Sequence, residues 1–267
     1  LYFAGEGSFT KGYFESPQNF SRFNGILKYH GSLNSNNTLT ASLTGFTSKW
    51  NASGQIPDRA VESGLVGFFG AIDNKEGGRT SRYNANLELQ TKLDNGGTIR
   101  NQLFYSKYRF ELYSNFTFYK EDPVNGDQVR QKESRDIVGY NGAYQQEFYI
   151  GNIKTETKAG IQVRYDAVDN IELTRTKDQV LNTKDIMLGD VNEMDAGAYW
   201  SQQFSVTKKL DITAALRTDY FTNRYNDQLA SKLLSANSII VSPKLNFNYR
   251  VSDKVQLYLY NGKGYHS

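Results

Sequence analysis

The sequence has little of the chemistry on which many known sites depend. None of its 267 residues is cysteine, which excludes disulfide scaffolds, thiolate metal sites and cysteine nucleophiles. Only two residues, His30 and His266, are histidine, so a histidine metal cluster or a serine–histidine triad has almost no material. We therefore predict no catalytic residue, no bound metal and no cofactor.

Long apolar runs are also missing. No window approaches the roughly 18 consecutive apolar residues of a transmembrane helix, and residues 1–30 lack the basic and apolar blocks of a signal peptide. The 31 basic and 28 acidic residues are interspersed, unlike the clustered basic stripe of a nucleic-acid-binding protein. The sequence therefore favours neither a helical membrane protein nor a nucleic-acid partner.

Aromatic residues, in contrast, are abundant. The chain has 19 Tyr and 16 Phe, although hydrophobic residues make up only 38% and the mean hydropathy is -0.62. The wall of a membrane β-barrel needs apolar residues only at every second position of each strand, and its lumen, turns and loops are polar. Low hydropathy combined with many rings is therefore typical of such a wall.

Apolar and polar residues alternate with a period of two, which is the strongest pattern in the chain. Successive side chains of a β-strand point to opposite faces, whereas a helix would mix the two sets. In the segment 79–93, Leu87 and Leu89 fall on an apolar face, and Arg82 and Glu88 fall on a polar face. Ten such strands are expected, at 20–33, 38–50, 79–93, 98–116, 135–149, 155–168, 194–204, 211–224, 241–251 and 255–265.

The connections between these segments alternate in length. Short turns are expected at 35–37, 94–97, 151–154, 207–210 and 252–254, and long loops at 51–78, 117–134, 169–193 and 225–238. An up-and-down barrel with short periplasmic turns and long extracellular loops produces this order, whereas a soluble Greek-key sandwich does not require it. The strand at 20–33 then runs toward the periplasm and the strand at 255–265 runs outward. Both chain ends are therefore expected near the exterior, as in an internal piece of a larger barrel.

Three stretches resemble the TonB-dependent receptors of the bacterial outer membrane. The first is the loop pattern from Trp50 to Thr80. The second is the pair of strands from Gly197 to Tyr220, which ends in an Arg-x-Asp-Tyr element. The third, from Ser242 to Ser267, contains a Ser-Pro-Lys strand, a tight turn and a Gly-x-Gly-aromatic end. The three stretches together span nearly the whole chain, and their order and spacing make the resemblance specific.

The resemblance implies an all-β fold, an antiparallel up-and-down transmembrane β-barrel of about 22 strands with a plug domain in its lumen. Residues 1–267 would be an open part of that barrel with about ten strands, without the plug domain or signal peptide. The expected partners are outer-membrane lipid, the plug domain and the TonB complex. The expected function is the receptor-mediated uptake of an iron chelate such as a ferric siderophore, and no enzymatic activity is expected. Cobalamin, haem, other metals and glycans are the alternative ligands.

Candidate site residues fall into two groups. Arginines on the polar face of a strand can bind an anionic ligand or the carbonyl groups of a plug, because a guanidinium offers a planar fork of donors. Arg82 and Arg164 lie toward the extracellular strand ends, so they are the better candidates for the ligand. The residues predicted to bind ligand are Trp50, Arg59, Asp73, Arg79, Arg82 and Arg164, and those predicted to face the plug or lumen are Glu88, Gln162, Arg217, Lys244 and Arg250.

Other readings remain open at this point. A passive porin would share the barrel pattern, and a plug domain upstream of Leu1 would decide against it. A ten-stranded protease of the omptin type uses acidic and histidine residues at the outer rim, where His266 would lie. The acidic residues Asp166, Asp169 and Glu172 could hold calcium, although a solvated loop explains them as well.

Overall fold

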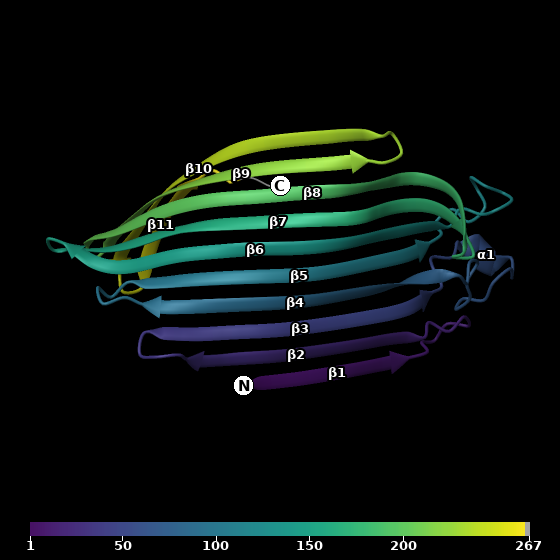
Figure 1. The fold of residues 1–267 in the computed structure, drawn as a ribbon, viewed down its shortest axis with the longest axis horizontal. Coiled ribbons are helices and arrows are strands. Elements are labelled where there is room, and N and C mark those ends of the chain that lie inside the picture. The colour runs from purple at the N-terminus through teal and green to yellow at the C-terminus, as the bar shows by residue number, and fades with distance from the viewer. Residues whose placement is uncertain (265–267) are drawn as a thin grey trace.

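The computed structural model describes residues 1–264 and consists of one antiparallel sheet whose strands follow chain order (Figure 1). This architecture confirms the predicted all-β, up-and-down fold. Within the described residues no helix has the length and apolar character needed to cross a membrane. The elements are β1 (Tyr2–Thr10), β2 (Phe20–Ser32), β3 (Asn37–Ala52), α1 (Asp58–Glu62), β4 (Glu76–Lys92), β5 (Thr98–Ser114), β6 (Val129–Ile150), β7 (Ile153–Lys177), β8 (Leu181–Thr207), β9 (Leu210–Asp227), β10 (Lys232–Ser252) and β11 (Val255–Gly262).

The sheet contains eleven strands, one more than the ten that the alternation predicts. The additional strand, β1, pairs with β2 along its whole length. Gly5 and Gly7 occupy its otherwise aromatic face, which weakens the apolar pattern in the sequence. Because β1 runs opposite to β2, the chain begins on the side of the short turns. The prediction that both ends lie near the exterior is therefore wrong for the first residue.

Two of the predicted long loops are strands instead. β7 and β8 continue through 169–193 and meet at a turn of residues 178–180, and β9 and β10 continue through 225–238 to a turn of residues 228–231. Asp178 and Gln179 adopt positive φ angles of 55° and 62°, which is typical of tight hairpin turns. Long loops do occur where 51–78 and 117–134 were predicted, but with other bounds: they span 53–75, which includes the helix α1, and 115–128, because β4 and β6 begin earlier than expected.

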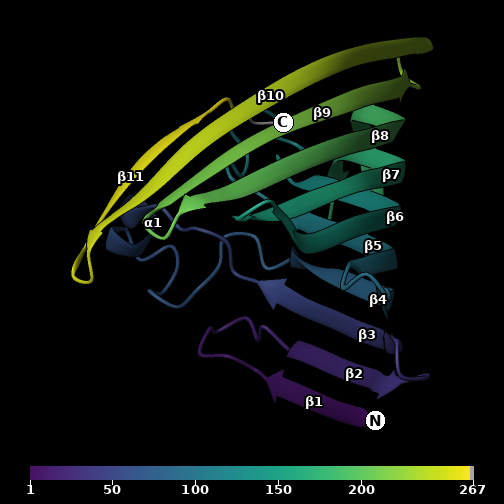
Figure 2. The ribbon, with the colours of Figure 1, turned by 90° about the vertical axis from the view of Figure 1, so that its left-hand side faces the viewer.

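The sheet is open, and β1 and β11 form its two edges. Figure 2 shows it as a curved wall, and no pairing joins β1 to β11 within residues 1–264. The open form is as predicted. The first edge is β1, not the segment 20–33, while the predicted edge at 255–265 corresponds to β11, with Tyr265 outside the described residues.

The strand register divides the side chains between two faces. Leu87 lies opposite Ala41 on β3 and Leu103 on β5, so these residues share an apolar face. Leu87 and Leu103 are 45% and 54% exposed, because no second layer covers them. On the other face, polar side chains bond from strand to strand. These bonds join Thr44 to Asn84, Asn84 to Ser106, Asn86 to Gln102, and Gln102 to Asn141.

On β5 and β6 the apolar face ends in a defined row on the side of the long loops. Tyr105 and Val138 are opposite each other in its last apolar row, and two residues further along the same strands Lys107 pairs with Asp136. Beyond this row the same face of β5 and β6 is mostly polar, whereas Tyr83 on β4 and Phe23 on β2 continue the apolar surface one and two rows further. The strands therefore extend past the apolar band, and the expected membrane-spanning part is the band itself.

We predict that Leu87 and Leu89 contact lipid and that Asn86 and Glu88 contact water in the lumen. In single-cysteine variants of the whole protein, a water-soluble thiol reagent should label Asn86→Cys and Glu88→Cys at least about tenfold faster than Leu87→Cys and Leu89→Cys, because a thiol in lipid is shielded from the reagent. The reverse labelling pattern would show that the two faces are exchanged.

Candidate functional site

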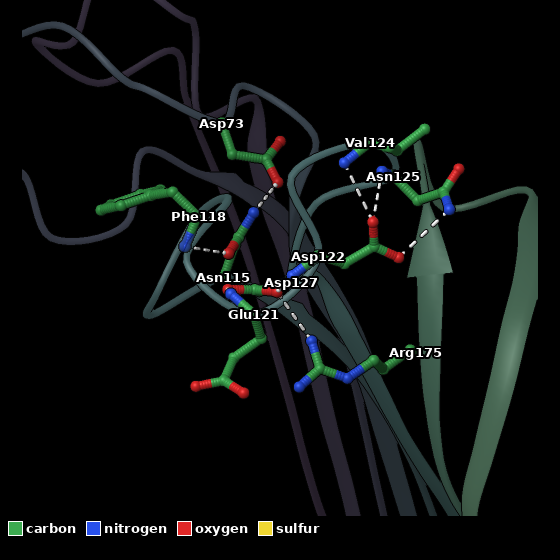
Figure 3. A network of polar contacts seen from close by, with 9 residues as sticks. All are labelled: Asp73, Asn115, Phe118, Glu121, Asp122, Val124, Asn125, Asp127 and Arg175. Atoms are coloured by element: carbon green, nitrogen blue, oxygen red, sulfur yellow. Dashed lines mark hydrogen bonds and ion pairs between the residues drawn. The ribbon is translucent and has the colours of Figure 1, made fainter.

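Asp73 joins two loops at the end of the sheet that carries the long connections. Its Oδ2 accepts a hydrogen bond from Asn115 Nδ2 at 2.9 Å (Figure 3). The same oxygen accepts one from Gln128 Nε2 at 3.0 Å, and Oδ1 accepts one from the backbone N–H of Lys75 at 2.9 Å. The 53–75 loop is therefore attached to the 115–128 loop through one carboxylate.

Asp127 organises the second of these loops. Its carboxylate accepts hydrogen bonds from the backbone N–H groups of Glu121 at 2.9 Å and Asp122 at 2.8 Å, and from Arg175 Nη1 at 2.8 Å (Figure 3). Burial by itself would raise the pKa of Asp127, but these hydrogen bonds and one from Thr117 outweigh it and lower the pKa to about 2. The residue is thus a permanent anion that fixes the loop on β7.

The turn between β7 and β8 is hydrogen-bonded to both loops. The backbone N–H of Gln179 donates to Gln128 Oε1 at 2.9 Å, and Gln179 Nε2 donates to the carbonyl oxygen of Lys75 at 2.5 Å. Three segments that are far apart in sequence therefore meet at one place. We refer to Asp73, Asn115, Asp127, Gln128, Arg175 and Gln179 together as the loop junction.

Glu76 lies directly beside the loop junction. It is 4% exposed, its Oε1 has no hydrogen-bond partner, and its carboxylate accepts a hydrogen bond from the backbone N–H of Asn115. Burial raises the pKa of Glu76 to about 7, and the nearby charge of Asp73 adds to the rise. Gly54 faces this carboxylate at φ +65°, a left-handed conformation that favours glycine, and a Cβ there would also displace Oε1, which it would approach to 2.1 Å.

A row of alternating aromatic and arginine residues crosses the polar face just below the loops. The row consists of four consecutive partners in the register, which are Phe46 on β3, Arg82 on β4, Tyr108 on β5 and Arg135 on β6. The Arg82 guanidinium carbon lies 4.9 Å from the centre of the Tyr108 ring, a cation–π geometry. The Tyr108 and Phe110 rings stack at 6.3 Å. We refer to the first four residues as the arginine–aromatic row.

Arg82 differs from Arg164 and Arg217 in its charge balance. Arg164 binds Asp166 through two hydrogen bonds of 2.7 and 2.6 Å, and Arg217 binds Asp219 in the same bidentate way. No carboxylate pairs with Arg82 in the described part of the chain. Its charge is therefore available to an incoming anion, whereas those of Arg164 and Arg217 are already compensated.

The other predicted ligand residues are dispersed. Trp50 is on the polar face, where its ring covers Gly78. Arg59 is exposed on α1, and Asp73 is in the loop junction. Arg79 has the register of the apolar face, beyond the apolar band, where it forms an ion pair with Glu111 at 2.5 Å. Arg79 and Arg82 thus point to opposite sides of the sheet.

The residues predicted to face the lumen all have the register of the polar face. Glu88 lies 3.7 Å from Arg100, and Gln162 pairs in register with Asn141. The remaining three, on other strands, are Arg217, Lys244 and Arg250.

The sequence reasoning misses most of the residues that these contacts bring together. Phe46, Tyr108 and Phe110 are aromatic residues in phase with the polar face, and this departure from the alternation could have singled them out. The hydrogen-bonding roles of Glu76 and Asp127 left no signal, because their partners come from other segments.

The described residues form neither a calcium site nor the catalytic site of a protease. No group of three or more histidine or acidic side chains within residues 1–264 is placed to hold a metal ion. Asp166 pairs with Arg164, and Glu172 pairs with Arg130. His266, on which the protease reading depends, lies outside the described residues.

Comparison with known proteins identifies a family. The model of the family described as "TonB dependent receptor-like, beta-barrel" matches residues 12–266. No curated protein sequence matches the chain.

Solved structures of similar fold cover nearly the whole chain. The unliganded ferric citrate transporter FecA aligns over 97% of this chain and 38% of its own, with a TM-score of 0.81 and 14% identity. The open form of the ferric-catecholate import receptor Fiu from E. coli K12 aligns over 97% of this chain and 49% of its own, with a TM-score of 0.70 and 11% identity. The siderophore receptor PiuA from Acinetobacter baumannii aligns over 94% of this chain and 43% of its own, with a TM-score of 0.71 and 13% identity. The chain thus spans less than half of each, which confirms that the open sheet corresponds to part of a larger barrel.

Asp127→Ala should open the 115–128 loop, because two backbone donors and Arg175 lose their acceptor. Each unsatisfied buried donor costs about 1–3 kcal/mol, so the free energy of local opening should fall by roughly 2–4 kcal/mol. Hydrogen exchange in the whole protein measures this change. Asp94→Ala, in an exposed short turn, is the matched control. Equal protection of the loop in Asp127→Ala and the native protein would contradict the assigned role.

Glu76 should make the order of the 53–75 loop depend on pH. The raised pKa means that this carboxyl's stabilising contribution is fully present below its ordinary pKa of 4.5 and is lost as the pH rises through about 7, amounting to at most about 3 kcal/mol. Hydrogen exchange, corrected for its intrinsic rate, should show the loop better protected at pH 5.5 than at pH 8.5.

Glu76→Gln should give the higher protection at both pH values, because the amide stays neutral. Glu62→Gln, an exposed change in the same loop, should keep the pH dependence of the native protein. A native loop with equal protection at both pH values would refute the role of Glu76.

Proposed function

This chain belongs to the TonB-dependent receptor family, and we propose that it forms part of the wall of a receptor that takes up a scarce ligand across the bacterial outer membrane. The family consists of outer-membrane transporters, not enzymes. In this proposal the polar face contacts a plug domain, the apolar face contacts lipid, and the TonB complex supplies energy from the periplasm. The loop junction then lies outside the cell, and the short turns lie in the periplasm.

We further propose that the ligand is an anionic iron chelate of the ferric siderophore class. The observation that carries this proposal is Arg82, whose guanidinium stacks on Tyr108 without a carboxylate partner in the described residues. Charged donors bind carboxylate or catecholate oxygens strongly, and the adjacent rings provide flat apolar contacts. Phe46 and Trp50 have the same register parity and extend this surface toward the loops.

The names of the similar structures are consistent with this ligand class. They include a ferric citrate transporter, a ferric-catecholate import receptor and a siderophore receptor. Both citrate and catecholate present anionic oxygen atoms around the metal, which match an unpaired guanidinium. A ligand of this kind would enter between the loop junction and the arginine–aromatic row.

Arg82→Ala in the whole receptor should weaken ligand binding, because a charge-assisted hydrogen bond and a stacked cation are lost. The expected loss is about 10- to 100-fold in Kd for the best of three probes: ferric citrate, a ferric tris-catecholate and a ferric trihydroxamate. Arg250→Ala removes the same charge from the same face near the short turns and is the matched control. Titration of the purified protein measures both.

Unchanged affinity in Arg82→Ala would rule out the proposed contact. A transport assay addresses the porin alternative: uptake of the best probe into intact cells should stop when TonB is deleted, whereas flux through a passive pore would continue.

A further inference from the structure

Five asparagines of this chain are followed by glycine, the neighbour that most favours cyclisation of an asparagine side chain onto the backbone. In that reaction the glycine nitrogen attacks the asparagine Cγ, and a glycine offers no side chain to hinder the approach. Three of the five, Asn24, Asn141 and Asn261, lie in paired strands, where an extended ψ keeps the nitrogen turned away from Cγ. The other two, Asn95 and Asn125, lie in connections between strands.

Asn125 is restrained by hydrogen bonds to one residue, Asp122. The nitrogen that would attack, that of Gly126, donates to the Asp122 carbonyl oxygen at 2.9 Å. The side-chain nitrogen that would leave, Asn125 Nδ2, donates to Asp122 Oδ2 at 3.1 Å, and the Asn125 backbone N–H donates to Asp122 Oδ1 at 2.9 Å (Figure 3). Both nitrogen atoms of the reaction are therefore held, and Asn125 should be stable.

Asn95 is exposed in the turn 93–97 between β4 and β5, and its side chain is arranged differently. The Gly97 N–H donates to Asn95 Oδ1 at 3.0 Å. This oxygen acquires negative charge when the Gly96 nitrogen attacks Cγ, so the Gly97 N–H is already placed to stabilise the oxyanion of the tetrahedral intermediate. No hydrogen bond restrains Asn95 Nδ2 in the described part of the chain.

A second donor reaches the turn from β6. Gln146 Nε2 donates to the Asn95 backbone carbonyl oxygen at 3.0 Å, and the Tyr144 hydroxyl donates to Gln146 Oε1, which fixes the orientation of that amide. A donor on a carbonyl oxygen withdraws electron density from the attached peptide nitrogen, here that of Gly96, so that this nitrogen loses its proton more readily. The Gly96 N–H itself donates to the Leu93 carbonyl oxygen at 3.0 Å, a single bond in an exposed turn that has to open before the attack.

We propose that the 93–97 turn promotes its own modification, in which Asn95 cyclises and deamidates. The Gly96 nitrogen forms a bond to Asn95 Cγ, the bond from Cγ to Nδ2 breaks, and ammonia leaves with the proton that the Gly96 nitrogen gives up. Water then opens the succinimide ring at either carbonyl group, which leaves aspartate or isoaspartate at this position. Isoaspartate adds one carbon atom to the main chain inside the hairpin that the Leu93 N–H closes on the Gly97 carbonyl oxygen at 2.8 Å.

Incubation of the whole protein in neutral buffer tests the site, with a synthetic peptide of residues 92–98 as the unfolded reference. Peptide mapping by mass spectrometry follows the conversion of all five asparagines, and enzymatic methylation of isoaspartate confirms the product. We expect Asn95 to convert at least about tenfold faster than Asn125, and faster than the same residue in the peptide, because only the folded turn holds both donors in place. Gln146→Leu should slow the conversion of Asn95 about 2- to 10-fold, and Tyr144→Phe should slow it by a smaller factor.

The matched control is Gln145→Leu, the same change one residue away, whose side chain bonds to Glu156 on the opposite face and should leave the rate unaltered. Heat-dependent mobility in gels shows whether each variant remains a folded barrel. Conversion of Asn95 that is slower in the protein than in the peptide would overturn the proposal, because the turn would then protect the asparagine. An unchanged rate in Gln146→Leu, or equal rates at Asn95 and Asn125, would do so as well.

Discussion

Backbone hydrogen bonding in lipid is the constraint on which the rest of this structure depends. An unpaired N–H or C=O in the hydrocarbon layer costs several kcal/mol, so strands there must pair without interruption. The eleven strands pair in sequence order, and register shifts occur at β6, β7 and β8 beyond the apolar band and at the ends near the short turns. Regular pairing through the band fixes which side chains face lipid and which face the lumen, so a one-residue slip would exchange the two environments.

The proposed binding site lies where the division of side chains into an apolar and a polar face is interrupted. On the polar face, Phe46 and Tyr108 are aromatic where the alternation calls for polar residues, and they surround the charge of Arg82. There the proposed ligand would supply anionic oxygen atoms to the guanidinium of Arg82.

The sequence predicts the sheet well because its main determinant is local. Alternation within one strand, as in Leu87 and Leu89 against Arg82 and Glu88, needs no knowledge of any other segment. Prediction fails where this contrast disappears. The strand extensions at 169–177 and 181–193 lack a clean alternation of apolar and polar residues and were expected as loop, and β1 carries glycines where rings should be. The residues of the loop junction cannot be paired from sequence, because their partners are brought together only by the fold.

The charge balance of the arginines shows why site prediction needs the structure even when the faces are known. Arg82 and Arg164 are equivalent by sequence, since both are on polar faces near the extracellular ends of their strands. Asp166, two residues from Arg164 on the same face, accepts hydrogen bonds from Nε and Nη2 of Arg164. The residue two positions from Arg82 is Asn84, whose amide donates to Thr44 instead. A carboxylate at the i+2 position of a strand therefore converts a potential anion site into a structural ion pair. The same rule assigns Arg217, with Asp219 at i+2, to structure, so that of these three arginines Arg82 keeps charge available for a ligand.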